Sequence, residues 1–195
     1  MKNRAGFTLI EVMIAIGVLS LVMGAIFLLS TSTRDAALAQ EAKLNAQDQV
    51  RNAMMQVVRE LRQSASASIN WNDLPGPAIS YRVPMDIDGN GVPVDSAGNL
   101  ELSPIRTISR DTQDLNNDGV TDTQLVLAHD GDFARVLGNQ LLIDRDVTGD
   151  GQLERGLWFE RSGAGVRVTI RAEIPAGPDG LRMLSQLQET VFPRN

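Results

Sequence analysis

The stretch GFTLIEVMIAI, from Gly6 to Ile16, decides the fold of this chain. A six-residue segment with two basic side chains, Lys2 and Arg4, precedes Phe7. The chain then stays apolar as far as Leu29, and Glu11 is the one ionisable side chain in that run. A single acid near the start of a long apolar segment is the feature that needs an explanation.

The apolar run is long enough to cross a membrane. As a helix, its 23 residues would reach roughly 34 Å, against a hydrocarbon core of about 30 Å. Positive charge lies before the run, and the larger, acidic part of the chain follows it. This distribution predicts a single pass through the bacterial inner membrane, with the amino terminus cytoplasmic and the rest of the chain periplasmic.

Two simpler interpretations of this segment account for fewer of its features. A secretory signal would place its apolar core before a small-residue cleavage site, and Ala37-Leu38-Ala39 is such a site, but the run is longer than a typical signal. A plain anchor accounts for length and orientation but gives no role to Glu11, which is costly in hydrocarbon.

A third interpretation is a resemblance. A short basic leader ending in Gly6, then Phe7, then an acid five residues into the new chain and an unbroken apolar run, resembles the class III signal of type IV pilins and type II secretion pseudopilins. The resemblance implies that a prepilin peptidase removes residues 1–6 by cutting between Gly6 and Phe7, and that the Phe7 amine is then methylated. The chain would be a substrate and not an enzyme.

The chemistry of Glu11 fits this resemblance. Cleavage after Gly6 creates an ammonium group on Phe7, one helical turn before Glu11. A carboxylate in low dielectric needs a cation, and the resemblance implies that the amine of a neighbouring subunit supplies it during assembly. Many pilins carry a proline in the apolar run, whereas this chain has none before residue 75.

The helix is predicted to continue past the membrane. Residues 7–34 form the apolar part, and residues 35–68 contain no Gly or Pro and place apolar residues at spacings of three and four. The second part should therefore lay one face on the globular head, residues 69–195. Its final string, Val57–Gln63, resembles the helix end of minor pilins of the W type and minor pseudopilins of the J type.

The head is predicted to be rich in antiparallel strands, which makes the fold α+β and pilin-like. The clearest strand is Val166–Ile174, where apolar and polar residues alternate. The other candidate strands are 78–83, 104–109, 123–128 and 156–161, and Thr190–Asn195 resembles the terminal strand of minor pilins. Trp71, Trp158 and Phe159 are expected to pack in the core.

Three acidic loops punctuated by glycine separate these strands. Alternate oxygen-bearing side chains before a glycine are typical of calcium loops, as in EF-hands, dockerins and thrombospondin type 3 repeats. The candidate ligands are Asp114, Asn116, Asp118, Val120 and Asp122; Asp146, Thr148, Asp150, Gln152 and Glu154; and, in a shorter match, Asp86, Asp88, Asn90 and Asp95. The acid that an EF-hand has at its twelfth position is missing from all three. We expect Ca²⁺ to stabilise the loops, and the alternative is that they are solvent-exposed turns without an ion.

Charge and composition disfavour two further classes of function, nucleic-acid binding and catalysis. The formal charge is −6, and it becomes −8 without the leader, which holds Lys2 and Arg4 and no acid, so nucleic acid is not an expected partner. The chain has no cysteine for disulfides. The single histidine, His129, lies in a turn-like string, and no hydrolase motif is present, so catalysis finds no support.

The sequence therefore predicts a structural minor pilin or pseudopilin of a type IV pilus or type II secretion pseudopilus. Its expected partners are other pilin-like subunits, the prepilin peptidase and the inner-membrane assembly platform. The alternative is a membrane-anchored, calcium-binding adhesive module whose helix is only a tether.

Overall fold

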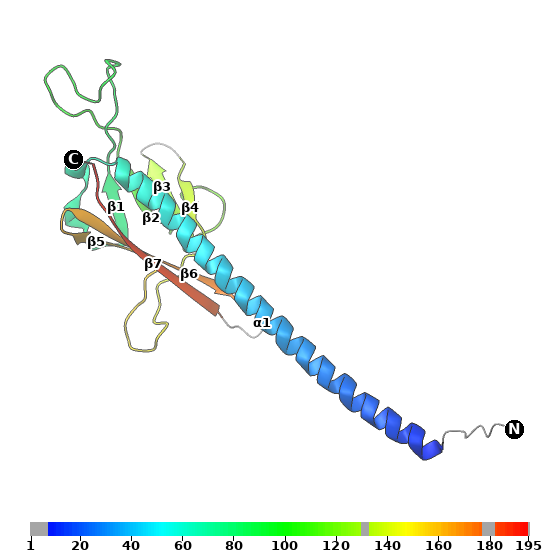
Figure 1. The fold of residues 1–195 in the computed structure, drawn as a ribbon. Helices are drawn as coiled ribbons and strands as arrows, with labels where there is room; N and C mark the ends of the chain where they lie inside the picture. Colours follow the sequence, from blue (N-terminus) through cyan, green and yellow to red (C-terminus); the bar gives the residue numbers. More distant parts are fainter. Residues whose placement is uncertain (1–7, 130–132, 177–181, 195) are drawn as a thin grey trace.

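The computed structural model describes residues 8–129, 133–176 and 182–194. One helix dominates the molecule: α1 runs from Leu9 to Gln63 and, at 55 residues, is roughly 82 Å long. The head is gathered around its carboxyl-terminal half, and the other half projects away from the head (Figure 1).

Both ends of α1 have local causes. At its start, Thr8 and Glu11 form a capping box, in which each side chain accepts a hydrogen bond from the backbone N–H of the other. At its end, Ser64 takes an extended backbone, and its N–H donates to the Leu61 carbonyl at 3.2 Å. The helix therefore ends at Gln63, five residues before the end of the segment 35–68 that was predicted to continue it.

Within the described residues, seven strands form two antiparallel sheets in the head. The four-stranded sheet has the order β1 (Ala78–Tyr81), β2 (Arg106–Arg110), β3 (Leu125–His129) and β4 (Arg135–Gly138). The three-stranded sheet has the order β5 (Leu157–Ser162), β6 (Gly165–Pro175) and β7 (Arg182–Val191). Two short 3₁₀ helices, Ser66–Ser68 and Trp71–Asp73, connect α1 to β1.

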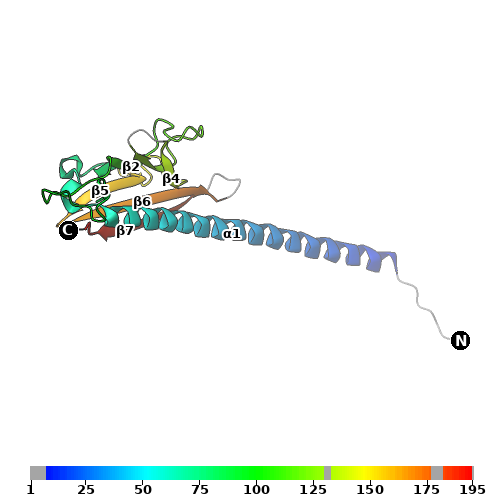
Figure 2. The same ribbon diagram turned by 90° about the horizontal axis from the view of Figure 1, so that it is seen from above.

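One side of α1 covers both sheets (Figure 2). The buried apolar residues of the helix recur every three or four positions and are Ala42, Ala46, Val50, Ala53, Met54, Val57, Val58 and Leu61. From Val50 to Leu61 they meet the buried side chains of the strands, among them Ile79, Ile108, Phe159 and Ile170, in one core. Ala42 and Ala46 pack with Ile174 and Ala176 in a smaller cluster. The two sheets adjoin where Gly76 and Phe159 exchange backbone hydrogen bonds of 3.0 and 2.9 Å.

An ionic cluster around the buried Glu60 also fixes the helix to the four-stranded sheet. The Glu60 side chain is 6% exposed and accepts from Arg135 of β4 at 2.6 Å and from Arg106 of β2 at 3.3 Å. The hydroxyl of Tyr81 on β1 donates to the same carboxylate at 3.4 Å. Burial and then the Glu60 carboxylate raise the pKa of Tyr81, which keeps the phenol in its donating form.

The α+β fold expected from the sequence is confirmed, with differences in detail. Each of the five candidate strands overlaps an observed strand, and the antiparallel pairing of β6 is as predicted. Strand β4 and most of β7 were not predicted. β4 is only four residues long, and β7 exposes polar residues such as Gln186 and Gln188 at the free edge of its sheet.

The expectation that both tryptophans pack in the core is wrong for Trp158. Phe159 is fully buried, and Trp71 packs against the core while partly exposed. Trp158 follows Leu157 on the strand and points to the opposite face of the sheet, where Arg155 covers its ring.

Candidate functional site

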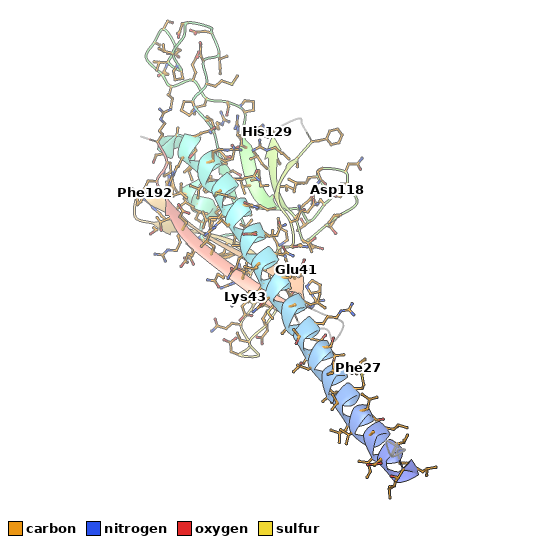
Figure 3. All side chains as sticks on the ribbon, turned by 45° about the vertical axis from the view of Figure 1, so that its right-hand side comes forward. Phe27, Glu41, Lys43, Asp118, His129 and Phe192 are labelled. Carbon is orange, nitrogen blue, oxygen red and sulfur yellow. The ribbon has the colours of Figure 1, made fainter. Side chains whose placement is uncertain are left out.

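The amino-terminal half of α1 has no contact with the head that would bury it. Every described residue from 8 to 38 is exposed, including Leu9 at 81%, Leu21 at 75% and Leu29 at 70%. Figure 3 shows apolar side chains, Phe27 among them, projecting around this half of the helix. The helix is long and apolar enough to cross a membrane, with a mean hydropathy of 2.8 over its most apolar 18 residues.

Glu11 is the one acid from residue 8 to residue 34, and its carboxylate accepts hydrogen bonds within the chain. Its Oε2 accepts from the backbone N–H of Thr8 at 2.9 Å and from the Thr8 hydroxyl at 3.1 Å. The carboxylate therefore stands at the amino-terminal end of the helix, where the helix dipole favours negative charge. The proposed cleavage site, Gly6 and Phe7, lies outside the described residues.

The acidic loop that follows β4 brings three carboxylates together. Asp146, Asp150 and Glu154 each place an oxygen within 4.8 Å of the others. The Val147 N–H at 2.6 Å and the Thr148 hydroxyl at 2.9 Å both donate to Glu154. These bonds, the Val147 N–H first, lower the pKa of Glu154, so the group stays charged at neutral pH.

Backbone N–H groups of the same loop, including that of the remaining predicted ligand Gln152, donate to its carboxylates. Gly149 and Gly151 donate their N–H groups to Asp146 at 2.6 and 2.8 Å, and Gln152 donates its N–H to Asp150 at 2.8 Å. Gly151 has φ +82°, in the left-handed region that favours glycine. This bend lies in the turn that brings Asp146, Asp150 and Glu154 close to one another.

A second carboxylate cluster lies on the long segment between β1 and β2, at the end of the head remote from the amino terminus (Figure 1). Asp86 and Asp88 are joined there by Glu101, again with oxygens within 4.8 Å of one another. The Gly91 N–H at 2.8 Å is the first of the bonds that lower the pKa of Asp86. The Asn90 side chain donates to Asp88 at 3.0 Å.

Asp95 serves a separate turn of the same segment. Its carboxylate accepts from the N–H groups of Ala97 and Asn99 at 2.9 and 2.8 Å and from the Asn99 side chain at 3.0 Å. The Asn99 side chain is the first cause that lowers the pKa of Asp95. In this geometry the group closes a turn and does not join the Asp86 cluster.

The loop between β2 and β3 is organised differently. Asp118 accepts hydrogen bonds from the side-chain amides of Gln124 at 2.8 Å and Asn116 at 2.9 Å. The Gln124 bond is the main cause that lowers the pKa of Asp118. Asp114 accepts from the N–H groups of Asp118 and Gly119 at 2.9 and 3.1 Å. The carboxylates of this loop thus bind amide donors of the chain.

Two further predicted ligands of this loop have backbone roles. The N–H of Val120 donates to Asp118 at 2.8 Å, and the N–H of Asp122 donates to the Asp111 carbonyl at 2.6 Å. Asp122 has φ +64°, a conformation that Asp adopts more readily than most residues. Within the described residues, the clusters of three acids are those around Asp86 and Asp146.

Comparison with known proteins finds a match for the amino-terminal segment of the chain. Residues 1–27 match the family model of the prokaryotic N-terminal methylation motif. The chain therefore carries a prepilin-type amino terminus. No curated protein and no solved structure matches the chain.

This motif indicates a type IV pilin-like or pseudopilin precursor, which is a substrate of processing and a structural subunit. The match ends at residue 27, inside the exposed half of α1, and does not extend to the head. The resemblance drawn from Gly6, Phe7 and Glu11 is confirmed at the level of this prepilin class. The motif also implies partners of the same kind, namely other pilin subunits and a prepilin peptidase.

Sequence spacing did not find two of the residues that shape the acidic loops. Glu101 lies 13 residues after Asp88, and it arrives because the segment folds back, with the Met85 N–H donating to the Glu101 carbonyl at 3.0 Å. Gln124 lies just outside the loop pattern, and its side chain bonds Asp118 and Asn116. The places of Glu101 and Gln124 depend on contacts with residues outside the local loop pattern.

Proposed function

We propose that this chain is a minor pilin or pseudopilin subunit that assembles through its amino-terminal helix into a type IV pilus or a type II secretion pseudopilus. The observation that carries the proposal is the exposed apolar half of α1 with Glu11 at its start, which overlaps the segment that matches the methylation motif, residues 1–27. In this proposal residues 1–6 are a leader, and the peptidase cuts between Gly6 and Phe7. The new Phe7 amine is then methylated.

The division of the chain follows from this assignment. Residues 7–34 form the membrane and filament-core part of the helix, residues 35–68 its amphipathic continuation, and residues 69–195 the head. The precursor is placed in the inner membrane with its amino terminus in the cytoplasm and its head in the periplasm. Extraction by the inner-membrane assembly platform then brings the apolar half against other subunits, which replace lipid around it.

Glu11 is proposed to exchange one partner for another during assembly. In the single chain its carboxylate binds Thr8. Between packed helices, a neighbouring Phe7 ammonium offers a charged partner, and a charge-assisted bond in low dielectric is stronger than a bond to a neutral group. The register of the subunits would follow from this pair.

Mass spectrometry and filament incorporation test the proposal. Mature protein from producing cells is expected to begin with an N-methylated Phe7, and Glu11→Ala is expected to lower incorporation into purified filaments at least tenfold, because a buried amine loses its charged partner. Glu41→Ala is the matched control, since Glu41 is exposed on the same helix. An intact Met1, a start at Gln40 or equal incorporation of the Glu11→Ala variant would refute the assignment.

We further propose that Ca²⁺ occupies the two carboxylate clusters and stabilises the head. The clusters consist of hard oxygen donors at close distance, which suits Ca²⁺, and the head has no cysteine to stabilise its loops in another way. The loop around Asp118 is proposed as a third site, for which its amide donors would have to turn and present oxygen. Binding to the folded state alone raises the melting temperature by mass action.

Melting of the full-length chain in detergent tests the calcium proposal. Adding calcium after chelation is expected to raise the melting temperature by several degrees, and the rise is expected to shrink in a Glu154→Gln variant, which loses one charged ligand. Asp73→Asn, at an acid outside the clusters, should respond as the unchanged chain does. A melting temperature that ignores both chelation and calcium would show that the loops are turns without an ion.

The adhesive alternative, with α1 only a tether, makes a different prediction for the same protein. A tether needs neither a methylated Phe7 nor Glu11, so Glu11→Ala would leave surface display unchanged. Co-purification of other pilin-like subunits with the unchanged chain, and its loss with Glu11→Ala, would favour the filament subunit.

A further inference from the structure

A polar groove lies on the face of the three-stranded sheet opposite to α1. Antiparallel register aligns Trp158 of β5 with Thr169 of β6 and Gln188 of β7 in one row across this face. Arg171 and Gln186 form the next row. With Leu153, Arg155 and Glu160, these side chains line a groove of about 380 Å³.

Two guanidinium groups are held in fixed positions in this groove. The guanidinium carbon of Arg155 stands 3.8 Å from the centre of the Trp158 ring. Arg171 donates from Nε to the Gln186 side chain at 2.7 Å and from Nη1 to the Arg155 carbonyl at 3.1 Å. Stacking and hydrogen bonding orient both groups before any partner arrives, which reduces the entropy cost of binding.

The donors of these groups are not used up within the described part of the chain. The Arg155 side chain makes no ion pair or hydrogen bond there, and Arg171 makes no ion pair. A stacked guanidinium keeps its N–H groups at the rim of its plane, where a second planar group can meet them. The groove therefore offers a planar fork of donors to a ligand.

The charge of the groove is opposite to that of the chain. Glu160 is the one acid among the lining residues, and Arg167 lies 3.7 Å from it. Two arginines then remain in the groove of a chain with a formal charge of −6. A local positive site on an acidic protein attracts negatively charged partners, which the rest of the acidic surface repels.

We propose that this groove binds an acidic segment of the neighbouring subunit in the filament. Arg155 and Arg171 would each receive a carboxylate in the two-pronged geometry that guanidinium groups favour. Gln186 and Gln188 have side-chain amides suited to the peptide backbone of such a segment. The identity of the partner rests on the proposed function, because assembly through α1 is what brings the heads of different subunits together.

Peptide binding to the full-length chain in detergent tests the groove without a filament. The probe is a fluorescent peptide of alternating Asp and Gly, and the matched probe replaces Asp by Asn. We expect the Asp peptide alone to bind, and Arg155→Gln to weaken it about tenfold, as loss of one charge-assisted hydrogen bond does. Arg155→Lys, which keeps the charge and loses the fork, should also bind more weakly than the unchanged chain.

The control variant is Arg161→Gln, because Arg161 stands over another ring, Trp71, at 5.0 Å and does not line the groove. It should bind the Asp peptide as the unchanged chain does. Equal binding of the Asp and Asn peptides, an equal loss in Arg161→Gln, or binding of a neutral oligosaccharide in place of the Asp peptide would overturn the proposal. Unchanged melting temperatures verify that each variant is folded.

Incorporation into filaments tests the neighbouring subunit as the source of the acidic segment. Arg155→Gln is expected to incorporate less than Arg161→Gln, and equal incorporation would overturn that source. The Glu11→Ala variant separates this idea from the proposed function, since it should bind the Asp peptide normally while failing to assemble. If Glu11→Ala assembles and still binds, the filament function fails and the groove remains an anion site.

Discussion

The two halves of α1 are one continuous helix with opposite surroundings. From residue 8 to residue 38 every side chain is exposed, although most of them are apolar. From Ala42 to Leu61 a stripe of apolar side chains is buried against both sheets. Apolar composition alone therefore does not make a core, because burial depends on what the rest of the chain places opposite the helix.

The difference teaches where each half must find its partner. The second half packs small and large apolar side chains against the strands of its own head. The free energy gained by burying these side chains therefore stabilises the folded head. The first half exposes large side chains around its circumference, which water does not tolerate over such an area. Lipid or other helices must cover it, and the methylation motif in the same segment indicates helices of the same class.

The largest loss of stability is expected from a substitution that leaves a cavity in the buried half of α1. Leu61 is fully buried, and Leu61→Ala should lower the free energy of unfolding of the head by about 2–5 kcal/mol, through lost burial and a residual cavity. The matched change in the exposed half is Leu21→Ala, at a residue that is 75% exposed. Thermal melting of both variants in detergent measures the contrast.

The two outcomes are distinct in that measurement. The Leu21→Ala variant should melt with the unchanged chain, whereas the Leu61→Ala variant should melt several degrees lower. If the two leucines contributed equally to the melting temperature of the head, the division of α1 into an assembly half and a folding half would be wrong.

An intermediate effect is expected from the two glutamates that mark the halves. Glu60→Gln leaves Arg106 and Arg135 without a charged partner, and should cost about 1–3 kcal/mol, reduced because Arg135 is half exposed to water. Glu11→Gln should leave the melting of the head unchanged and lower assembly instead. Glu41→Gln controls for loss of charge on the helix without loss of a partner in the head.

Two other outcomes would contradict the assignment of Glu60 to folding and Glu11 to assembly. A Glu60→Gln chain that melts normally but does not assemble would place the ionic cluster at a subunit interface. A Glu11→Gln chain with a destabilised head would mean that the amino-terminal cap supports folding over the whole length of α1.

Much of this division follows from local sequence signals. The apolar run, Thr8 with Glu11, and the three-to-four spacing after residue 38 predict both halves of the helix, because helical periodicity and capping are local. The alternation in β6 is equally local. The joining of Glu101 to Asp86, and the stacking of Arg155 on Trp158, depend on chain reversal and on which sheet face the core takes.

β7 shows the same limit in a strand. Its inner-face residues, such as Leu187 and Val191, are separated by polar ones, and Glu189 occupies an inward position beside the end of α1. The alternation of apolar and polar residues is therefore interrupted, and the strand is recognised only through its pairing with β6. An edge strand tolerates this pattern because one side of it meets water.

The smallest effect on stability is expected from an exposed ion pair near the carboxyl-terminal end of α1. Arg62 pairs with Glu189 of β7 at 3.6 Å, with side chains 65% and 41% exposed, and Arg62→Ala should change the free energy of unfolding by at most about 0.5 kcal/mol. Leu61→Ala, at the neighbouring position, should lower the free energy of unfolding several times more than Arg62→Ala does. Because the two positions are adjacent, helix propensity and distance from the head are nearly matched, and burial is the variable that differs. A loss for Arg62→Ala as large as that for Leu61→Ala would show that charge pairing and not apolar packing holds this half of the helix on the sheets.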